Sequence, residues 1–371
     1  MSDLIARRLK YAREAKGWTQ AELSKKFGFK DRQTLAAIEA GQRKMTADEL
    51  VRAIEIFKLD LDFFTDSFRL VGEGSFNWRA DPRAAAGLHT NFEEKAGRWI
   101  ATYRQLGEDQ GVTPTVLRKH LPLNVRHTFE DAMAAAETLG REWQLGDRPA
   151  QKLEQAVEHE LGALILYVDA PAGVSGAACQ LPGMSTILIN RNEPEGRRHF
   201  DLAHECFHLL TWGQMPPEHT ESIETSYRGK GKQKRIEQLA NIFASALLMP
   251  ERALNPLWQA RGEEDINRWL NRTASAFLVS AQALRYRLKN LGWLSKADEL
   301  DIQDTALIAN GRPQIEQRKP RLFNEDFVRR VQKAIENGDL SVRRAASLLD
   351  CTVEDLADLF RDYGFPVPFD L

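Results

Sequence analysis

The sequence contains little cysteine, and this scarcity excludes two common devices for stabilising a fold. Its three cysteines, Cys179, Cys206 and Cys351, are widely spaced and form no CxxC pair. A disulfide framework needs paired cysteines, and a cysteine zinc site uses closely spaced pairs. We therefore expect three reduced thiols and no metal held by cysteine.

The sequence also lacks long hydrophobic runs. No stretch reaches the roughly eighteen apolar residues that a membrane-spanning helix needs. Charges recur from Arg7 onward, so the first residues do not form the apolar stretch of a secretory signal peptide. We therefore expect a cytoplasmic protein that does not bind a membrane.

The length and composition indicate a globular protein with more than one domain. The 371 residues exceed what one hydrophobic core usually organises, and 43% of them are hydrophobic and 28% charged. Helical periodicity dominates the chain and short apolar runs are few. The expected fold class is mostly α with a small β-sheet, an α+β protein.

Residues 1–66 show the pattern of five short helices. Thr19 with Glu22, and Thr46 with Glu49, are two capping boxes that begin helices, and Gly28 can close the helix between them. This arrangement predicts a helix-turn-helix. The apolar residues at helical spacing that should form its core are Leu9, Trp18, Leu23, Phe27, Leu35, Ile38, Leu50 and Ile54.

A small sheet is predicted in the middle of the chain. Residues 163–168 are a short apolar run typical of a buried strand. Residues 176–180 and 185–190 are two further strand candidates, and turn residues separate them. Residues 76–145 are polar and helix-compatible, which indicates a connector. Residues 213–234 are polar and rich in glycine and proline, so they are expected to form a surface loop.

The motif His204-Glu205-Cys206-Phe207-His208 has metal-binding spacing. Four residues make about one helical turn, so both imidazoles project from one face and can hold one zinc ion. Glu205 lies beside them and can handle the proton of a metal-activated water. The alternative is a pair of core histidines with ordinary hydrogen-bond partners.

A catalytic zinc usually needs a third protein ligand. The candidates that follow the motif are His219, Glu221, Glu224 and Glu237. The first three lie in the polar loop, whereas Glu237 lies on an amphipathic helix that can run antiparallel to the motif helix. We therefore predict Glu237 as the third ligand.

These residues resemble a known family. The run from Arg198 to His208, followed by the run from Glu237 to Pro250, resembles the ImmA/IrrE metallo-endopeptidases over roughly residues 146–295. The resemblance implies that His204, His208 and Glu237 bind zinc and that Glu205 is the general base. The pair Cys206-Phe207 departs from the small residues that are frequent in the family, but the ligands are intact.

Two other roles stay open at this stage. The group that stabilises the oxyanion opposite zinc has four polar candidates: Tyr227, Arg285, Tyr286 and Arg287. Cys179 lies in a predicted strand and is either an inhibitory thiolate near the metal or, as is usual for a free cysteine, a small buried hydrophobe.

The N-terminal segment resembles the Cro/repressor-type (XRE) helix-turn-helix family over residues 5–64. In such a fold the second helix of the motif enters the major groove of DNA. The residues expected to read base edges are Lys30, Arg32, Gln33 and Thr34. Those expected to hold phosphates are Gln20, Arg43 and Lys44.

A protein-binding helical bundle is the alternative for this domain, because residues 1–66 carry 13 Lys and Arg against 11 Asp and Glu. If it binds DNA, we expect a homodimer on palindromic half-sites. Residues 340–360 have the rhythm of a second helix-turn-helix, in which Arg343 and Arg344 would meet DNA. Acidic residues at 354, 355 and 358 favour a packing or dimerisation role instead.

The chain is therefore divided into four regions: residues 1–66, an XRE-type helix-turn-helix domain; 67–145, a helical connector; 146–300, an ImmA/IrrE-like zinc metallopeptidase domain; and 301–371, a C-terminal helical region. The favoured function is a DNA-binding regulatory zinc endopeptidase that cuts a specific repressor- or antitoxin-type protein in stress response, mobile-element control or phage defence. The alternative is a transcriptional regulator of its own operon whose peptidase-like domain senses a signal or partner without cleaving.

Overall fold

The computed structural model describes residues 2–81, 85–112, 119–222, 231–307 and 319–370. It is mostly α-helical with one small sheet, which confirms the predicted fold class. Its buried apolar residues form three clusters: one in the N-terminal domain and one on each face of the sheet. Within the described stretches, no helix is both long enough and apolar enough to cross a membrane.

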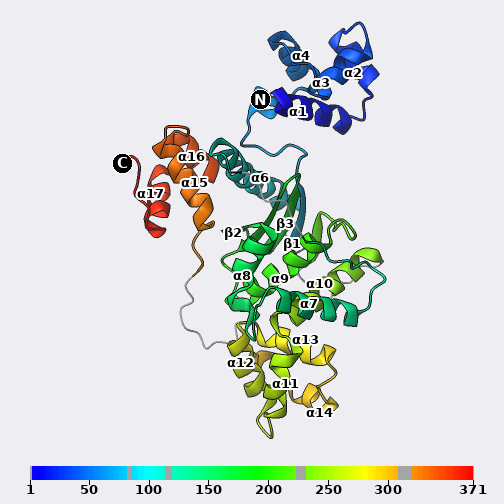
Figure 1. Cartoon of the computed structure of the whole chain (residues 1–371), viewed down its shortest axis with the longest axis vertical. Coiled ribbons are helices and arrows are strands. Elements are labelled where there is room, and N and C mark those ends of the chain that lie inside the picture. Colours follow the sequence, from blue (N-terminus) through cyan, green and yellow to red (C-terminus); the bar gives the residue numbers. More distant parts are fainter. Residues whose placement is uncertain (1, 82–84, 113–118, 223–230, 308–318, 371) are drawn as a thin grey trace.

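The N-terminal domain is a bundle of five helices that stands apart at one end of the molecule (Figure 1). Both predicted capping boxes are present, and Gly28 ends the second helix with a φ of 72°. The predicted core is confirmed, with Trp18, Leu50 and Ile54 at its edge. The five helices are α1 (Ser2–Ala15), α2 (Gln20–Phe27), α3 (Arg32–Glu39), α4 (Ala47–Phe57) and α5 (Leu61–Thr65).

The sheet has five strands in the order β2-β4-β3-β1-β5. Strand β3 runs antiparallel to β4 and β1, whereas β2 is parallel to β4, and β5 is parallel to β1. The three predicted strands are confirmed as β2, β3 and β4. The strand bounds are β1 Ser75–Ala80, β2 Leu164–Val168, β3 Val174–Leu181, β4 Met184–Asn190 and β5 Thr220–Ser222.

Strands β1 and β5 lie in segments that the sequence predicted as connector and surface loop. The sequence did not predict strand β1, because two of its buried residues are polar. Asn77 is 0% exposed and donates to the Glu218 carbonyl at 2.6 Å, while Arg79 is 4% exposed and pairs with Asp201. Partners distant in the sequence compensate the burial of these side chains, so the strand lacks an apolar signature.

Successive strand residues point to opposite faces of the sheet and supply its two cores. Ile165, Tyr167 and Ala178 belong to one core, and Leu164, Leu166 and Cys179 belong to the other. Helices cover both faces (Figure 1). The first core is built with α7 (Phe129–Glu142), α9 (Glu195–Thr211) and α10 (Lys232–Leu248), and the second with α6 (Ala85–Asp109), α15 (Glu325–Glu336), α16 (Val342–Leu349) and α17 (Val353–Asp362).

A further helical group extends the first core at the end of the molecule opposite the N-terminal domain (Figure 1). It comprises α11 (Glu251–Gln259), α12 (Ile266–Phe277), α13 (Ala281–Asn290) and α14 (Lys296–Asp301). The short elements are α8 (Leu153–Ala156), 3₁₀ turns at Pro149–Gln151 and Asp304–Ala306, and a π turn at Val157–Leu161.

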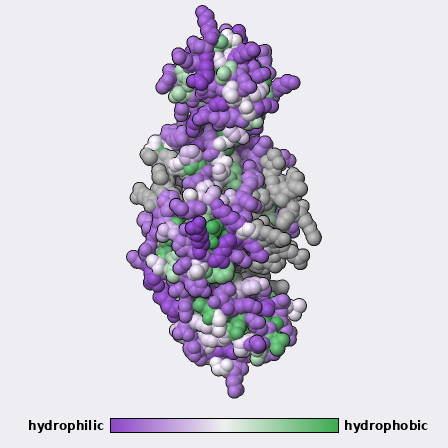
Figure 2. Space-filling model, turned by 90° about the vertical axis from the view of Figure 1, so that its right-hand side faces the viewer, coloured by the Kyte–Doolittle hydropathy of each residue, from purple (hydrophilic) through white to green (hydrophobic). Residues whose placement is uncertain are grey.

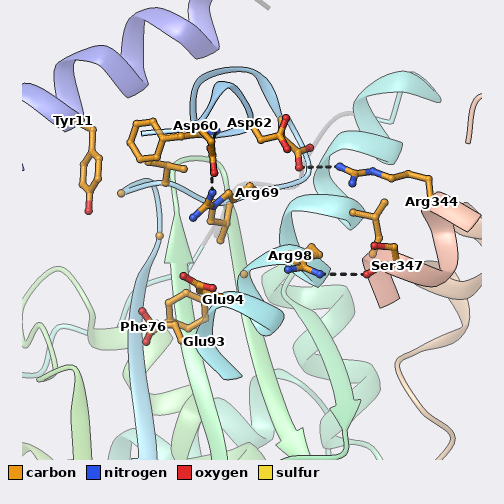
Figure 3. Close-up of a pocket in the computed structure, with 18 of the residues that line it drawn as sticks. Tyr11, Asp60, Asp62, Arg69, Phe76, Glu93, Glu94, Arg98, Arg344 and Ser347 are labelled. Carbon is orange, nitrogen blue, oxygen red and sulfur yellow. Dashed lines mark hydrogen bonds and ion pairs between the residues drawn. The ribbon is translucent and has the colours of Figure 1, made fainter. Parts of the chain in front are cut away.

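The N-terminal domain joins the body through residues 66–74, beside a cavity of about 680 Å³ (Figure 3). Arg344 of α16 donates to the Asp66 carboxylate at 2.8 Å across this joint. Helix α16 also packs on α6, where Trp99 Nε1 donates to the Leu349 carbonyl and Lys95 pairs with Asp350 at 2.7 Å. The C-terminal helices therefore pack against the chain's own sheet domain and reach the joint.

Candidate metal centre and helix-turn-helix

Helix α9 is placed by a close backbone contact at its first turn. A Cβ atom on Gly196 would lie 2.6 Å from the Val279 carbonyl carbon and 2.7 Å from the Ser280 nitrogen. Real Cβ contacts are never this short, so only glycine lets α9 approach the residues that precede α13. The helix then runs through the core, where both His204 and His208 are buried.

Helix α10 brings the predicted third ligand to these histidines. His204 contacts Asn241 and His208 contacts Glu237, so α9 and α10 run antiparallel, as expected. The Nε2 atoms of His204 and His208 are 3.0 Å apart. Glu237 Oε2 lies 3.3 Å from the first Nε2 and 3.7 Å from the second.

These separations suit a tetrahedral ion. Zinc–ligand distances of about 2.0–2.2 Å at tetrahedral angles put ligand atoms roughly 3.3–3.5 Å apart, within the observed spread. The His204, His208 and Glu237 side chains are 1%, 0% and 5% exposed. Convergence of two imidazole nitrogens on one carboxylate fits a metal site better than two core histidines with separate partners. Of the described side chains, these three form the group that could hold a metal ion.

A neighbouring amide orients this group. His204 Nδ1 lies 3.1 Å from Asn241 Oδ1, and a hydrogen bond from Nδ1 to this oxygen leaves Nε2 directed at Glu237. Gln233 Nε2 donates to Glu237 Oε1 at 3.3 Å. The sequence interpretation gave Asn241 no role, although its position four residues after Glu237 places both on one helix face.

The proposed general base follows His204 directly on α9, and its carboxylate is fully buried. Of the other ligand candidates, only His219 has a described side chain, and it is not part of this cluster. His219 pairs with Glu93 at 2.6 Å. The side chain of Glu221 and the whole of Glu224 lie outside the described residues.

Two of the four candidates for oxyanion stabilisation are engaged elsewhere. Arg287 is fully buried and donates to the Met249 carbonyl at 3.0 Å and to Glu137 at 2.9 Å. Arg285 pairs with Asp304 at 2.5 Å. Tyr286 lines a cavity near the cluster, and Tyr227 lies outside the described residues.

Two of the three cysteine thiols, those of Cys179 and Cys206, are fully buried. Cys179 is buried in the core on the sheet face away from α9, and burial raises the pKa of its thiol well above the usual value. Burial also raises the pKa of the Cys206 thiol, on α9. The position of Cys179 fits the small buried hydrophobe of the sequence interpretation.

A buried ion-pair network lies behind the histidines, and the sequence gave no sign of it. Asp201, three residues before His204, is 0% exposed. Its carboxylate lies 3.3 Å from Arg79 Nε of β1 and 3.3 Å from Arg197 Nε of α9. The network ties the metal-site helix to the sheet strand that the sequence did not predict.

The residues expected to read bases lie at the start of α3. Lys30, Arg32 and Gln33 are exposed there. Thr34 is half-buried, and its backbone N–H and hydroxyl both donate to the helix-capping Asp31 carboxylate at 3.0 and 3.2 Å. The N-terminal domain shows a mostly hydrophilic surface on the face that Figure 2 presents.

Two of the three residues expected to hold phosphates are engaged within the domain. Gln20 donates to Glu39 at 2.9 Å. Arg43 makes a two-pronged pair with Glu49, at 3.0 and 2.8 Å, and this hydrogen bonding raises the pKa of Arg43. Lys44 is exposed. A phosphate contact by Gln20 or Arg43 would therefore have to replace an existing hydrogen bond.

Comparison with known proteins identifies two domains. Residues 158–289 match the IrrE N-terminal-like domain family, and residues 9–64 match a helix-turn-helix family. The radiation response metalloprotease IrrE of Deinococcus radiodurans is 32% identical over 164 residues, which are 43% of this chain and 48% of that protein. The protein of the same name from Deinococcus deserti is 34% identical over 107 residues, which are 29% of this chain and 37% of that protein.

The matched segments thus span half or less of those relatives' length. No solved structure is significantly similar to the chain. The two matched segments coincide with the five-helix bundle and with the region that holds the His-His-Glu cluster. The chain therefore joins an XRE-type helix-turn-helix domain to a domain of the IrrE N-terminal-like family.

Proposed function

We propose that this chain is a DNA-binding zinc endopeptidase that makes a limited cut in a specific protein. The observation that carries the proposal is the convergence of His204, His208 and Glu237, whose ligand atoms all lie within 4.8 Å of one another. Glu205 follows the first ligand on the same helix. The metalloprotease names of the two relatives support the same chemistry.

Each residue has a defined task in this proposal. A zinc ion held by the three ligands would supply Lewis-acid activation of a water molecule and of the scissile carbonyl. Glu205 accepts the proton of the attacking water on a carboxylate oxygen and passes it to the leaving amine. Asn241 keeps His204 in the tautomer that presents Nε2 to the ion.

The substrate class follows from the joined domains. A helix-turn-helix holds the peptidase domain beside DNA, where repressors and antitoxin-type regulators also bind. Cutting such a regulator would change transcription in stress response, mobile-element control or phage defence, and the radiation-response names of the relatives favour the first. Dimerisation on a palindromic operator remains a prediction.

Metal analysis of purified protein tests the centre. We expect about one zinc per wild-type chain, and a loss of tight binding in His204→Ala and Glu237→Ala. His219→Ala is the matched control, because His219 was a ligand candidate and instead pairs with Glu93. Absence of zinc after reconstitution would favour the regulator whose peptidase-like domain senses a signal or partner.

Glu205→Gln tests the cutting step separately. The variant should keep its zinc and lose cleavage, since the amide cannot accept the water proton. Cellular N-terminal peptide profiles of wild type and variant, compared under several stresses, should differ at the cut site. Identical profiles would sink the cleavage hypothesis and leave the non-cleaving regulator.

Operator binding tests the N-terminal domain. The double change Arg32→Ala/Gln33→Ala removes two exposed side chains at the start of α3, and we expect weaker binding and altered base preference at the chain's own promoter. Lys44→Ala should weaken binding to all sequences equally. Unchanged affinity in the double variant would favour the protein-binding alternative for this domain.

A further inference from the structure

A cavity of about 610 Å³ lies beside the first turns of α9, next to residues that flank the metal ligands. Phe200 lines it, one helical turn before His204. Asn241 also lines it and contacts His204 Nδ1 at 3.1 Å. One helical turn rises about 5.4 Å, so Phe200 in the cavity wall lies about that far along α9 from the ligand His204.

The apolar part of the cavity wall comes from four helices, and polar side chains such as Gln238, Gln282 and Asn290 complete the lining. Phe129 lies at the start of α7, Phe200 on α9, Ile242 on α10, and Ala283 and Tyr286 on α13. Three of these five side chains are aromatic, and aromatic walls favour a large apolar partner. The volume lies within the range of about 300–1,000 Å³ that is typical of pockets for small organic groups.

The charged groups at the rim are paired with one another. Arg79 and Arg197 both contact the buried Asp201 carboxylate, and the Arg79 guanidinium lies 5.7 Å from the centre of the Phe200 ring. Ser175 links Glu193 and Arg197: its hydroxyl donates to the Glu193 carboxylate at 3.1 Å and accepts from the Arg197 guanidinium at 3.3 Å. Two guanidiniums and two carboxylates leave no excess charge to select an ionic ligand.

We propose that this cavity is a subsite for a large apolar side chain, leucine- or phenylalanine-like, of a substrate residue next to the scissile bond. The inference rests on the proposed function and adds the substrate chemistry to it. Burial of such a side chain favours binding by roughly 10- to 100-fold over glycine. The segment that is cut in the partner protein therefore carries a large apolar residue at this position.

Amino-acid hydroxamates provide the test, because the hydroxamate binds zinc and the side chain reports on the subsite. Dissociation constants are measured by calorimetry on the zinc-loaded full chain for the glycine, phenylalanine and aspartate compounds. Wild type should bind the phenylalanine compound roughly 10- to 100-fold tighter than the other two. Ala283→Trp fills the cavity and should abolish that preference while it keeps glycine hydroxamate binding and zinc content.

Lys289→Trp is the matched control, since Lys289 lies on the same helix outside the cavity and should leave the preference intact. If Ala283→Trp does not fold, Tyr286→Ala replaces it in the test. Tyr286 is 40% exposed at the rim, so its removal takes away only part of the wall and should lower the preference for the phenylalanine compound several-fold. Equal affinities in wild type, a preference for aspartate, or a preference that survives Ala283→Trp would overturn the subsite alone. Failure of every hydroxamate to bind would overturn the proposed zinc peptidase as well.

Discussion

Asn241 of α10 orients the His204 imidazole. Its side-chain oxygen lies 3.1 Å from Nδ1 of the imidazole. Removal of such an oriented partner typically lowers metal affinity by about 10- to 100-fold. We expect this loss in Asn241→Ala, measured by competition with a chelating dye, and a much smaller loss in Asn241→Asp, which keeps the acceptor.

Gln238→Ala is the control for that measurement, because Gln238 is exposed on the same helix and lines the same cavity. If Asn241→Ala binds zinc as tightly as Gln238→Ala does, the hydrogen bond to His204 contributes nothing to the site.

His199 makes stability depend on pH. Burial lowers the pKa of its imidazole below the usual value of 6.5, although Nδ1 lies 2.8 Å from the Leu278 carbonyl oxygen. The unfolded chain therefore takes up a proton near pH 6.5, while folded His199 stays neutral to lower pH. Its contribution to stability is complete above pH 6.5 and is lost as pH falls from there toward the lower folded pKa.

Urea unfolding at a series of pH values between about 7 and 5 checks this sign. His199→Gln keeps a hydrogen-bond donor without a titrating group, so its free energy of unfolding should fall less steeply than that of wild type. His159, whose side chain is 83% exposed, provides the control in His159→Gln. A wild-type slope in His199→Gln would contradict the assignment.

For individual residues, the sequence predicted the candidate metal ligands better than the side chains that surround them. Helix periodicity alone puts His204 and His208 on one face of a helix. Glu237 lies on a separate helix, and its prediction as a ligand rests on the amphipathic pattern of that helix and on the family resemblance. The Arg79–Asp201 pair could not be foreseen. Its partners are separated by more than a hundred residues, and nothing local in β1 shows that an arginine there is buried.

Helix α9 depends on a glycine in its first turn. Gly196 faces the backbone of residues 279 and 280, and an added Cβ would meet it at 2.6 Å. Backbone cannot rotate away as a flexible side chain can, so we expect Gly196→Ala to shift α9 and to destabilise the fold by about 1–3 kcal/mol.

Thermal and urea unfolding with zinc analysis measure this effect. Gly213→Ala is the matched control just beyond the other end of α9, where an added Cβ meets nothing within 4 Å. The control should stay within about 0.5 kcal/mol of wild type. Equal stability of the two variants would show that α9 tolerates displacement at its start.

At the level of elements, the sequence predicted those that carry a local signal. Strand β2 is a continuous apolar run, β4 carries an apolar run between turn residues, and helices α2 and α4 start with capping boxes. Strand β5 has only three residues and pairs in parallel with β1 alone. Its existence depends on a strand distant in the sequence, so no local pattern could reveal it.

Across the whole molecule, residues 66–74 connect two cores that do not otherwise merge. Val71 packs in the N-terminal core, whereas Phe68 and Leu70 pack against the sheet domain. Arg8, fully buried in α1, donates to the Phe63 carbonyl at 2.9 Å and to the Asp66 carbonyl at 2.8 Å. Arg8 of the N-terminal domain thus holds the start of the connecting segment, at Asp66, against α1.

The C-terminal helices hold the same segment through Arg344, which Figure 3 shows at this joint. Its guanidinium donates to Asp66 and lies 5.8 Å from the centre of the Phe68 ring. The two side chains are 45% and 20% exposed, so solvent limits this pair to at most about 1 kcal/mol. Arg344→Ala should therefore leave global unfolding nearly unchanged but speed hydrogen exchange of the 66–74 amides by up to about fivefold.

Arg343→Ala separates this joint role from DNA binding by α16, because Arg343 is exposed beside Arg344. If α16 only holds residues 66–74 in place, Arg343→Ala should change neither the amide exchange of these residues nor operator affinity. In wild type, about 1 M salt should then reproduce the exchange pattern of Arg344→Ala, because salt screens the ion pair. If α16 instead contacts DNA, both variants weaken operator binding to a similar degree while the exchange of residues 66–74 differs between them. Equal exchange in wild type and Arg344→Ala would remove the C-terminal helices from the joint altogether.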